Sequence, residues 1–149
     1  MPGNWHNFIE NQFPADIREV KFLYSSSVSN TCRRADIILS NKRTCEVQHS
    51  YISEKEIVNR FNDWNKFGKE IIWLIDGNEG IELDKLSSGN YLLIFKQVWK
   101  YKSFIKTYNF ILLEKDQLVF KIELDKIKSG MIELKEPKTI EETIDYLKK

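Results

Sequence analysis

Two acidic residues, Asp36 and Glu46, interrupt two apolar segments that lie close together in the sequence. Residues 35–39 (ADIIL) and 44–47 (TCEV) have the composition of buried strands, with a short polar turn between them. A carboxylate is costly to bury unless it is paired or binds a metal ion. Two neighbouring carboxylates also repel each other, and a divalent cation between them removes that repulsion. We therefore expect Asp36 and Glu46 to bind a metal ion, with the backbone carbonyl of Val47 as a third oxygen ligand.

The length of the turn decides whether the two carboxylates share a face of the sheet. Side chains alternate along a strand, so Glu46 and Gln48 lie on one face. Asp36 joins that face only if it lies opposite residue 46 or 48, which requires a three-residue turn at 40–42 or a bulge. A two-residue turn would place Asp36 opposite Val47 and separate the carboxylates. The metal-site hypothesis therefore predicts an odd-length turn or a bulge.

The residues that follow predict a strand, a helix and a second strand. Ser53 and Glu56 form a capping box, and the helix that they begin should run to about residue 66, before Gly68. Residues 71–75 (IIWLI) form a continuous apolar strand. In such a unit the two strands are parallel and the crossover is right-handed, so we expect the Glu46 strand to run parallel to residues 71–75.

The rest of the chain predicts shorter elements around this unit. Before it, the pattern predicts a helix at 5–12, a strand at 19–24 and a polar loop at 25–31. After it come an irregular segment at 81–89, a segment at 91–101 that periodicity leaves open between strand and helix, a hairpin of 109–113 and 118–123 around 114–117, and an edge strand at 131–134. A second capping box at 139–142 begins a C-terminal helix that runs to residue 147.

Composition and charge indicate an ordinary globular domain. The chain has 149 residues, 42% of them hydrophobic, so we expect a single domain over 1–149. The net charge is +1, so affinity for nucleic acid would have to come from a local basic patch. Two cysteines are too few for a disulfide framework, and neither a signal peptide nor a long apolar segment is visible. We expect a cytoplasmic protein that does not enter a membrane.

The densest mixture of basic and aromatic residues lies between residues 96 and 106. Lys96, Lys100 and Lys102 alternate there with Trp99 and Tyr101. Such a mixture suits a phosphate backbone and stacked bases, although a basic run is more commonly a solvated charged face. We treat these lysines, together with Arg33, Arg34 and Arg60, as the candidates for contacts with nucleic acid.

An aspartate on one strand followed by Glu-x-Gln on the next resembles the PD-(D/E)XK nuclease superfamily. The chain looks most like the competence-protein CoiA-like nuclease group, and EVQHSYIS is the most specific run. The matching residues are Trp5, His6, Phe13, Pro14, Glu19, Val20, Ala35, Asp36, Glu46, Gln48, His49, Ser50, Ile52, Glu56, Arg60, Ile72 and Trp73. They span about the first half of the chain.

The resemblance implies a fold and an activity. The fold would be α/β, with a mixed sheet of restriction-endonuclease type flanked by helices. The activity would be hydrolysis of nucleic acid, DNA above all, with Mg²⁺ or Mn²⁺ as cofactor, and homodimerisation is left open. The superfamily lysine is Gln48 here, Asn4 replaces an acidic residue expected before Trp-His, and Glu10 falls where relatives tend to have lysine.

Several residues have both a catalytic and a structural interpretation. Gln48 can orient a water or bind the metal through its amide oxygen, or be a hydrogen-bonded structural amide. His6 and His49, the only histidines, are candidate general bases, or packing and surface residues. Glu19 belongs to the active site or to the surface. Asp36 and Glu46 could instead pair with neighbouring arginines, and a nuclease fold with weak catalysis would be a nucleic-acid-binding module.

Overall fold

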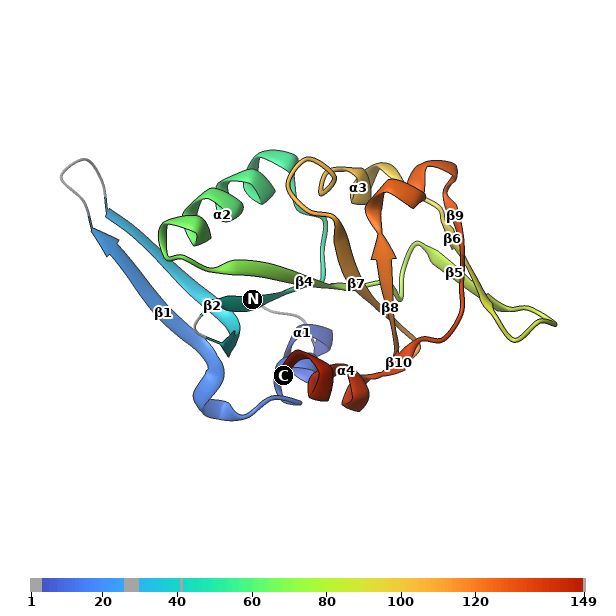
Figure 1. Ribbon diagram of the computed structural model, residues 1–149, viewed down its shortest axis with the longest axis horizontal. Coiled ribbons are helices and arrows are strands. Elements are labelled where there is room, and N and C mark those ends of the chain that lie inside the picture. The colour runs from blue at the N-terminus through green and yellow to red at the C-terminus, as the bar shows by residue number, and fades with distance from the viewer. Residues whose placement is uncertain (1–3, 26–29, 41, 149) are drawn as a thin grey trace.

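The computed structural model describes residues 4–25, 30–40 and 42–148 (Figure 1). The larger sheet has seven strands, in the spatial order β1 (Arg18–Ser25), β2 (Asn30–Ser40), β3 (Arg43–Gln48), β4 (Glu70–Asp76), β7 (Phe110–Lys115), β8 (Leu118–Glu123) and β10 (Lys138–Thr139). A smaller sheet has the order β5 (Ile81–Lys85), β6 (Tyr91–Phe95) and β9 (Met131–Leu134). The helices are α1 (Asn4–Glu10), α2 (Glu54–Lys66), α3 (Trp99–Lys102) and α4 (Ile140–Lys148), with short 3-10 helices at Ala15–Ile17 and Leu124–Ser129.

The centre of the larger sheet is parallel and its outer strands are antiparallel. β3 pairs with β4 and β4 pairs with β7 in parallel, whereas β1–β2, β2–β3, β7–β8 and β8–β10 are antiparallel. Helix α2 connects β3 to β4, which confirms the predicted strand–helix–strand unit. The fold is therefore the expected mixed α/β sheet flanked by helices.

Helices cover both faces of the larger sheet. In Figure 1, α2 and α3 lie above the sheet and α1 and α4 lie below it. Trp64 of α2 packs in a core that also includes residues of the smaller sheet, such as Leu93. Ile9 of α1 and Ile144 of α4 pack in a second core on the opposite face. Side chains of β3 are therefore enclosed on both sides, which accounts for its continuous buried run.

The capping predictions are confirmed at both helices. The Ser53 hydroxyl accepts a hydrogen bond from the Glu56 backbone N–H at 3.2 Å, and Gly68 follows α2 with a φ of +69°. At α4, the Thr139 hydroxyl accepts from Glu142 N–H while the Glu142 carboxylate accepts from Thr139 N–H. Because these hydrogen bonds are local, both helices begin where the sequence indicates.

A bulge in β2 confirms the register that the metal-site hypothesis requires. Ile37 lies opposite Cys45 and Ile38 opposite Thr44, but Ser40 lies opposite Arg43, so one extra residue of β2 is accommodated at Leu39. Extended by one residue past Ile37 and Cys45, where the pairing ends, this register places Asp36 opposite Glu46. The turn residue Asn41 and residues 26–29 of the predicted polar loop lie outside the described residues.

The second half of the chain differs most from the sequence-based prediction at residues 81–89, and the short strand β10 was also not predicted. Residues 81–89 are predicted to be irregular, yet β5 (Ile81–Lys85) pairs with β6 along five residues. Ile81 and Leu83 turn inward while Glu82 and Asp84 face outward, so the strand has a period of two that its charged residues obscure. Segment 91–101 divides into β6 and α3. The longest described helix, α2, has 13 residues, and no helix in the described ranges has the length and apolar content needed to cross a bilayer.

Candidate metal centre

The carboxylate of Asp36 lies where β2 and β3 separate. The backbone pairing of these strands runs from Ser40 and Arg43 to Ile37 and Cys45. Past the last pair, Ile37 and Cys45, the Val47 backbone N–H donates a 2.7 Å hydrogen bond to the side-chain oxygen Asp36 Oδ2 instead of to a carbonyl of β2. The Asp36 side chain is therefore held in place by the backbone of β3 through Oδ2, and its second oxygen, Oδ1, lies on the side of His6.

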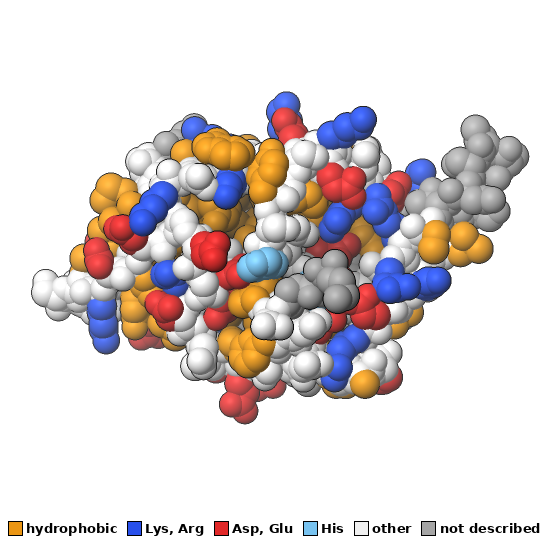
Figure 2. All heavy atoms as spheres, turned by 180° about the vertical axis from the view of Figure 1, so that it is seen from behind, with side chains coloured by type: hydrophobic (Ala, Val, Ile, Leu, Met, Phe, Trp, Pro, Cys, Tyr) orange, Lys and Arg blue, Asp and Glu red, His pale blue; other side chains and the backbone are white. Residues whose placement is uncertain are grey.

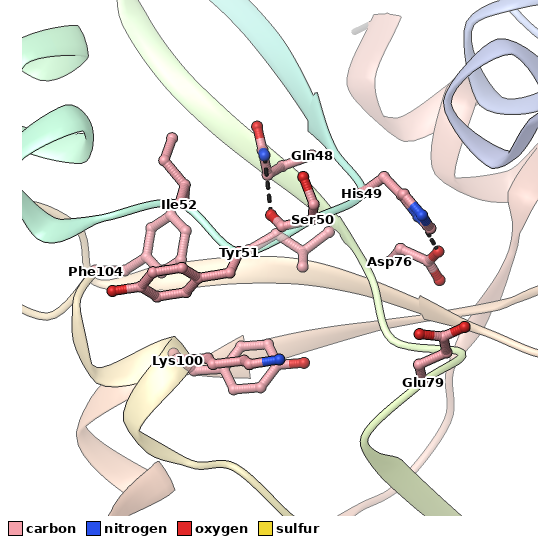
Figure 3. Close-up of a pocket in the computed structure, with 11 residues that line it drawn as sticks. Gln48, His49, Ser50, Tyr51, Ile52, Asp76, Glu79, Lys100 and Phe104 are labelled. Atoms are coloured by element: carbon pink, nitrogen blue, oxygen red, sulfur yellow. Dashed lines mark hydrogen bonds and ion pairs between the residues drawn. The ribbon is translucent and has the colours of Figure 1, made fainter. Parts of the chain in front are cut away.

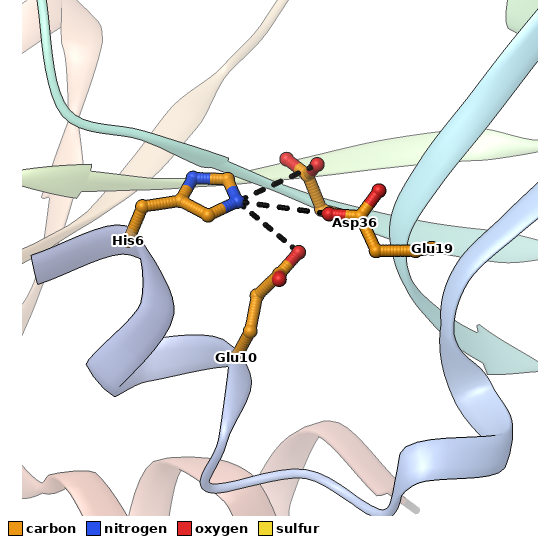
Figure 4. A group of neighbouring side chains, drawn as sticks. All are labelled: His6, Glu10, Glu19 and Asp36. Carbon is orange, nitrogen blue, oxygen red and sulfur yellow. Dashed lines mark ion pairs between the residues drawn. The ribbon is translucent and has the colours of Figure 1, made fainter. Parts of the chain in front are cut away.

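Helix α1 and strand β1 bring three further side chains to Asp36 (Figure 4). His6 Nε2 lies 3.1 Å from Glu10 Oε1, 3.9 Å from Glu19 Oε1 and 3.9 Å from Asp36 Oδ1. One potential ligand atom from each of these four residues lies within 4.8 Å of the others. His6 and Glu10 share a face of α1 because they are four residues apart. Carboxylates and an imidazole from three elements thus surround a position that a metal ion could occupy.

The backbone of Glu19 is strained. Its φ is +52°, a left-handed conformation that a non-glycine residue rarely adopts. Arg18 lies opposite Ile37 and Val20 opposite Ala35, so Glu19 lies opposite Asp36. Strain of this kind persists where the surrounding structure over-determines it, and functional sites are common examples.

Glu10 is a buried carboxyl group beside other carboxylates. Burial raises its pKa to about 8, and a hydrogen bond and charge repulsion from Glu19, with repulsion from Asp36, act in the same direction. Glu10 Oε1 and His6 Nε2 are buried, and neither makes a hydrogen bond of good geometry despite their 3.1 Å separation. These two buried atoms lie in the cluster without a hydrogen-bond partner of good geometry, which is the situation that a cation would correct.

Glu46 approaches Asp36 from the opposite side. Its residue is 4% exposed, and its Oε1 accepts a 3.0 Å hydrogen bond from Trp64 Nε1 of α2. Burial raises its pKa to about 8, with repulsion from and hydrogen bonding to Asp36 adding to the effect and Arg60 and Trp64 opposing it. Asp36 therefore has the predicted partner Glu46 on one side and the group of His6, Glu10 and Glu19 on the other. Glu46 is not a member of the 4.8 Å group.

The candidate arginines pair with other acidic residues. Arg33 contacts Asp63 at 2.7 Å and Glu56 at 3.6 Å, and Arg60 contacts Glu56 at 3.0 Å. Arg34 lies 3.8 Å from Glu19. Within the described ranges, no arginine forms an ion pair with Asp36 or Glu46. The structural alternative of direct arginine pairing therefore does not account for the burial of these two carboxylates.

Gln48 and His49, which follow Glu46 on β3, face different surroundings. The Gln48 amide Nε2 donates to the Ser50 carbonyl at 2.9 Å. His49 Nδ1 lies 2.7 Å from Asp76 Oδ2, and the His49 ring lies 6.2 Å from that of Trp5. Because an ionised carboxylate only accepts hydrogen bonds, Asp76 selects the tautomer with hydrogen on Nδ1 and leaves Nε2 as the outer nitrogen. Figure 2, the view from behind that of Figure 1, shows a histidine at the surface with acidic side chains beside it.

A hydrogen-bond network that the sequence does not predict supports His49 and α1. Asn78 Nδ2 donates to both Asp76 Oδ1 and Glu114 Oε2, and Trp5 Nε1 donates to Glu114 Oε2 at 3.0 Å. The sequence pattern places Glu114 in a turn, but it is buried within β7, and the turn consists of Asp116 and Gln117, which have positive φ values. The one signal in the sequence is that Asp76 ends a parallel strand next to another strand end, where functional side chains gather.

In the part of the chain that the structure describes, the three candidate lysines form no ion pair with the acidic cluster. Lys96 lies 3.3 Å from Glu82, and Lys100 Nζ lies 5.8 Å from the centre of the Trp99 ring. Lys102 is exposed at the end of α3. Their contacts with nucleic acid stay a prediction. Lys100 also lines a surface cavity, of which Gln48 forms another part of the wall.

Most of the chain matches a known protein family. A protein-family model described as the competence protein CoiA, nuclease-like domain, matches residues 20–133, more than half of the chain. The matched span includes Asp36, Glu46 and Gln48 and begins one residue after Glu19. No curated protein and no solved structure matches the chain significantly.

Proposed function

Because the chain belongs to the CoiA nuclease-like domain family, we propose that it hydrolyses phosphodiester bonds of DNA and requires Mg²⁺ or Mn²⁺. One observation carries the proposal beyond the family match. Asp36 is held by a backbone hydrogen bond, and the buried carboxyl groups of Glu10 and Glu46 interact with it, each with its pKa raised to about 8. Acidic groups gathered in this way destabilise a protein unless they bind a cation.

The residues at this position fit a hard divalent cation. Carboxylate oxygens are the ligands that Mg²⁺ and Mn²⁺ prefer, and an imidazole favours Mn²⁺ over Mg²⁺. Asp36 would be the ligand that the residues on the α2 side and those on the α1 side have in common. Glu46 and the Val47 carbonyl would complete the set on the α2 side, and His6, Glu10 and Glu19 would supply ligands on the α1 side.

The protein side chains would divide the remaining work. When bound, a divalent cation supplies positive charge for the phosphate oxygens and lowers the pKa of a bound water. Gln48 would orient a water molecule through its amide. His49, whose orientation Asp76 sets, and His6, where it is not a ligand, would transfer protons. Arg33, Arg34, Arg60, Lys96, Lys100 and Lys102 are the candidates for phosphate contacts.

A nucleic-acid-binding module with weak catalysis is the second candidate. It is favoured by the hydrogen bond from Gln48 to the Ser50 carbonyl, because this amide replaces the superfamily lysine and cannot supply a positive charge. Such a protein would bind both metal and DNA without appreciable cleavage.

A nuclease assay distinguishes these functions. Single-stranded, duplex and branched DNA would be incubated with the protein and Mg²⁺, Mn²⁺ or EDTA. We expect metal-dependent cleavage of at least one form by the wild type and none by Asp36→Ala, with Asp84→Ala on the exposed face of β5 as the control. Cleavage in EDTA, or equal cleavage by Asp36→Ala, would contradict the proposed site. DNA binding without cleavage would favour the module, and Gln48→Lys would then be the variant expected to gain activity.

A further inference from the structure

A cavity of about 240 Å³ opens at the end of strand β3, the strand that carries Glu46. It lies between the residues that follow β3, the end of β4 and helix α3 (Figure 3). Gln48, two residues after Glu46, forms part of its wall. The cavity is smaller than those that usually enclose drug-sized ligands, so it suits one small group of a larger substrate.

Aromatic side chains give this cavity flat apolar walls. Tyr101 and Phe104 are buried beneath it, whereas Tyr51 lines it with 52% of its surface exposed. The Tyr51 ring contacts that of Trp99 edge to face at 5.3 Å, and Trp99 is 54% exposed. Tyr51 at the cavity and Trp99 packed against it are thus two large aromatic residues exposed side by side, which folding alone does not require.

Charged groups lie on different sides of the same cavity. Lys100 lines it from α3, with Nζ lying 5.8 Å from the Trp99 ring centre. Asp76 and Glu79 lie across the cavity, beside His49 (Figure 3). A cationic group next to aromatic rings suits a phosphate-linked base. The Asp76 oxygens already accept hydrogen bonds from His49 and Asn78, so Glu79 is the carboxylate that would accept from the amino and imino groups at a base edge.

The geometry points to a subsite for an unpaired nucleobase of the substrate strand, with the base stacked on Tyr51 and contacting Trp99 beside it, and with its phosphate near Lys100. This inference rests on the proposed function, since the base belongs to the strand whose phosphodiester reaches Asp36. A base within a duplex has both faces covered by its neighbours and its edge paired, so only an unstacked base can enter an aromatic-walled cavity. The substrate class that follows is single-stranded DNA, or DNA with unpaired segments.

Binding without metal tests the subsite separately from catalysis. Fluorescence anisotropy in EDTA would compare a labelled single-stranded oligonucleotide with the duplex of the same sequence. We expect the wild type to prefer the single strand, and Tyr51→Ala and Trp99→Ala each to weaken that binding roughly 5- to 100-fold. Tyr146→Ala is the matched control, because Tyr146 is also an exposed tyrosine, at 49%, but lies on α4.

The outcomes separate the subsite from the nuclease. Preference for the duplex, or affinity of Tyr51→Ala and Trp99→Ala equal to that of Tyr146→Ala, would overturn the subsite even if the wild type cleaves DNA with metal. Single-strand binding that depends on Tyr51 would support it even if no cleavage occurs. Thermal melts of all three variants confirm that each is folded, and because the substituted side chains are exposed we expect melting temperatures close to that of the wild type.

Discussion

Asp36 accepts a 2.7 Å hydrogen bond from the backbone N–H of Val47, a residue of the neighbouring strand. This bond replaces the strand pairing that ends at Ile37 and Cys45. Asp36 therefore keeps its position opposite Glu46 through the backbone, and its charge is not matched by an ion pair with an arginine of the described ranges. A carboxylate positioned in this way is available to a cation.

Asp36→Asn should separate a metal ligand from a structural carboxylate. Asparagine keeps an oxygen that can accept from Val47 N–H but removes one of the repelling charges. In EDTA the variant should be at least as stable as the wild type. With metal at a hundredfold excess over Kd, the wild type should gain about 2.7 kcal/mol and the variant almost nothing. Thermal melts with EDTA, Mg²⁺ and Mn²⁺ measure both effects.

Asp84→Asn, on the exposed part of β5, controls for loss of a negative charge elsewhere. A loss of about 3–5 kcal/mol in Asp36→Asn, equal with and without metal, would indicate a buried structural pair instead.

The stability of the metal-free protein should fall as pH rises from about 5 to about 9. Glu10 and Glu46 each have a pKa raised from 4.5 to about 8 in the folded protein. Between pH 4.5 and 8 the folded state retains protons that the unfolded state has released. The contribution of Glu10 and Glu46 to the free energy of unfolding is therefore fully present below pH 4.5 and is lost as the pH passes through 8. Melting temperatures in EDTA should decrease by several degrees across this interval.

Glu46→Gln and Glu10→Gln should each reduce this pH dependence, because an amide does not titrate. A melting temperature in EDTA that rises over the same interval would contradict the raised pKa values of both glutamates.

Glu19→Gly should be tolerated better than a glycine elsewhere in β1. The φ of +52° at Glu19 suits glycine, and the substitution also removes a carboxylate from the cluster. We expect the free energy of unfolding in EDTA to stay equal or to rise by up to about 1 kcal/mol. Lys21→Gly, at an exposed position of the same strand, should lower it by about 0.5–1 kcal/mol. Denaturant unfolding compares the two, and an equal loss in both would show that Glu19 carries no strain.

Asp76→Asn should lower cleavage through His49. The substitution removes the charge that selects the His49 tautomer, and we expect a decrease in kcat of roughly 10- to 100-fold. If Asp76 acts only by positioning the histidine, His49→Ala and the double variant should have similar rates, because effects within one functional unit are not additive. Additive losses in the double variant would assign Asp76 a separate role, and the pH profile of kcat should change in both single variants.

Local rules in the sequence predicted the central part of the fold. The Ser53 and Thr139 capping boxes, the parallel pairing of residues 71–75 and the hairpin of β7 and β8 depend on contacts between residues that are close in the chain or on strand alternation. An odd-length turn or a bulge was predicted for a chemical reason, since only such a register brings Asp36 to the face of the sheet that Glu46 and Gln48 share, and the structure has a bulge in β2. Strand β5 was missed because its pairing with β6, and not its own charged sequence, stabilises it.

The sequence alone determined which residues were candidates for the chemistry, because two carboxylates in adjacent buried strands are too costly to keep without a partner or a cation. Only the tertiary structure decided what surrounds them. Glu10 and His6 reach Asp36 because α1 packs across β3, and Asp76 and Glu114 meet His49 and Trp5 because parallel strands end at the same edge of the sheet. Such contacts join residues up to 109 positions apart, as in the hydrogen bond from Trp5 to Glu114, and the packing that creates them leaves no pattern in either segment alone.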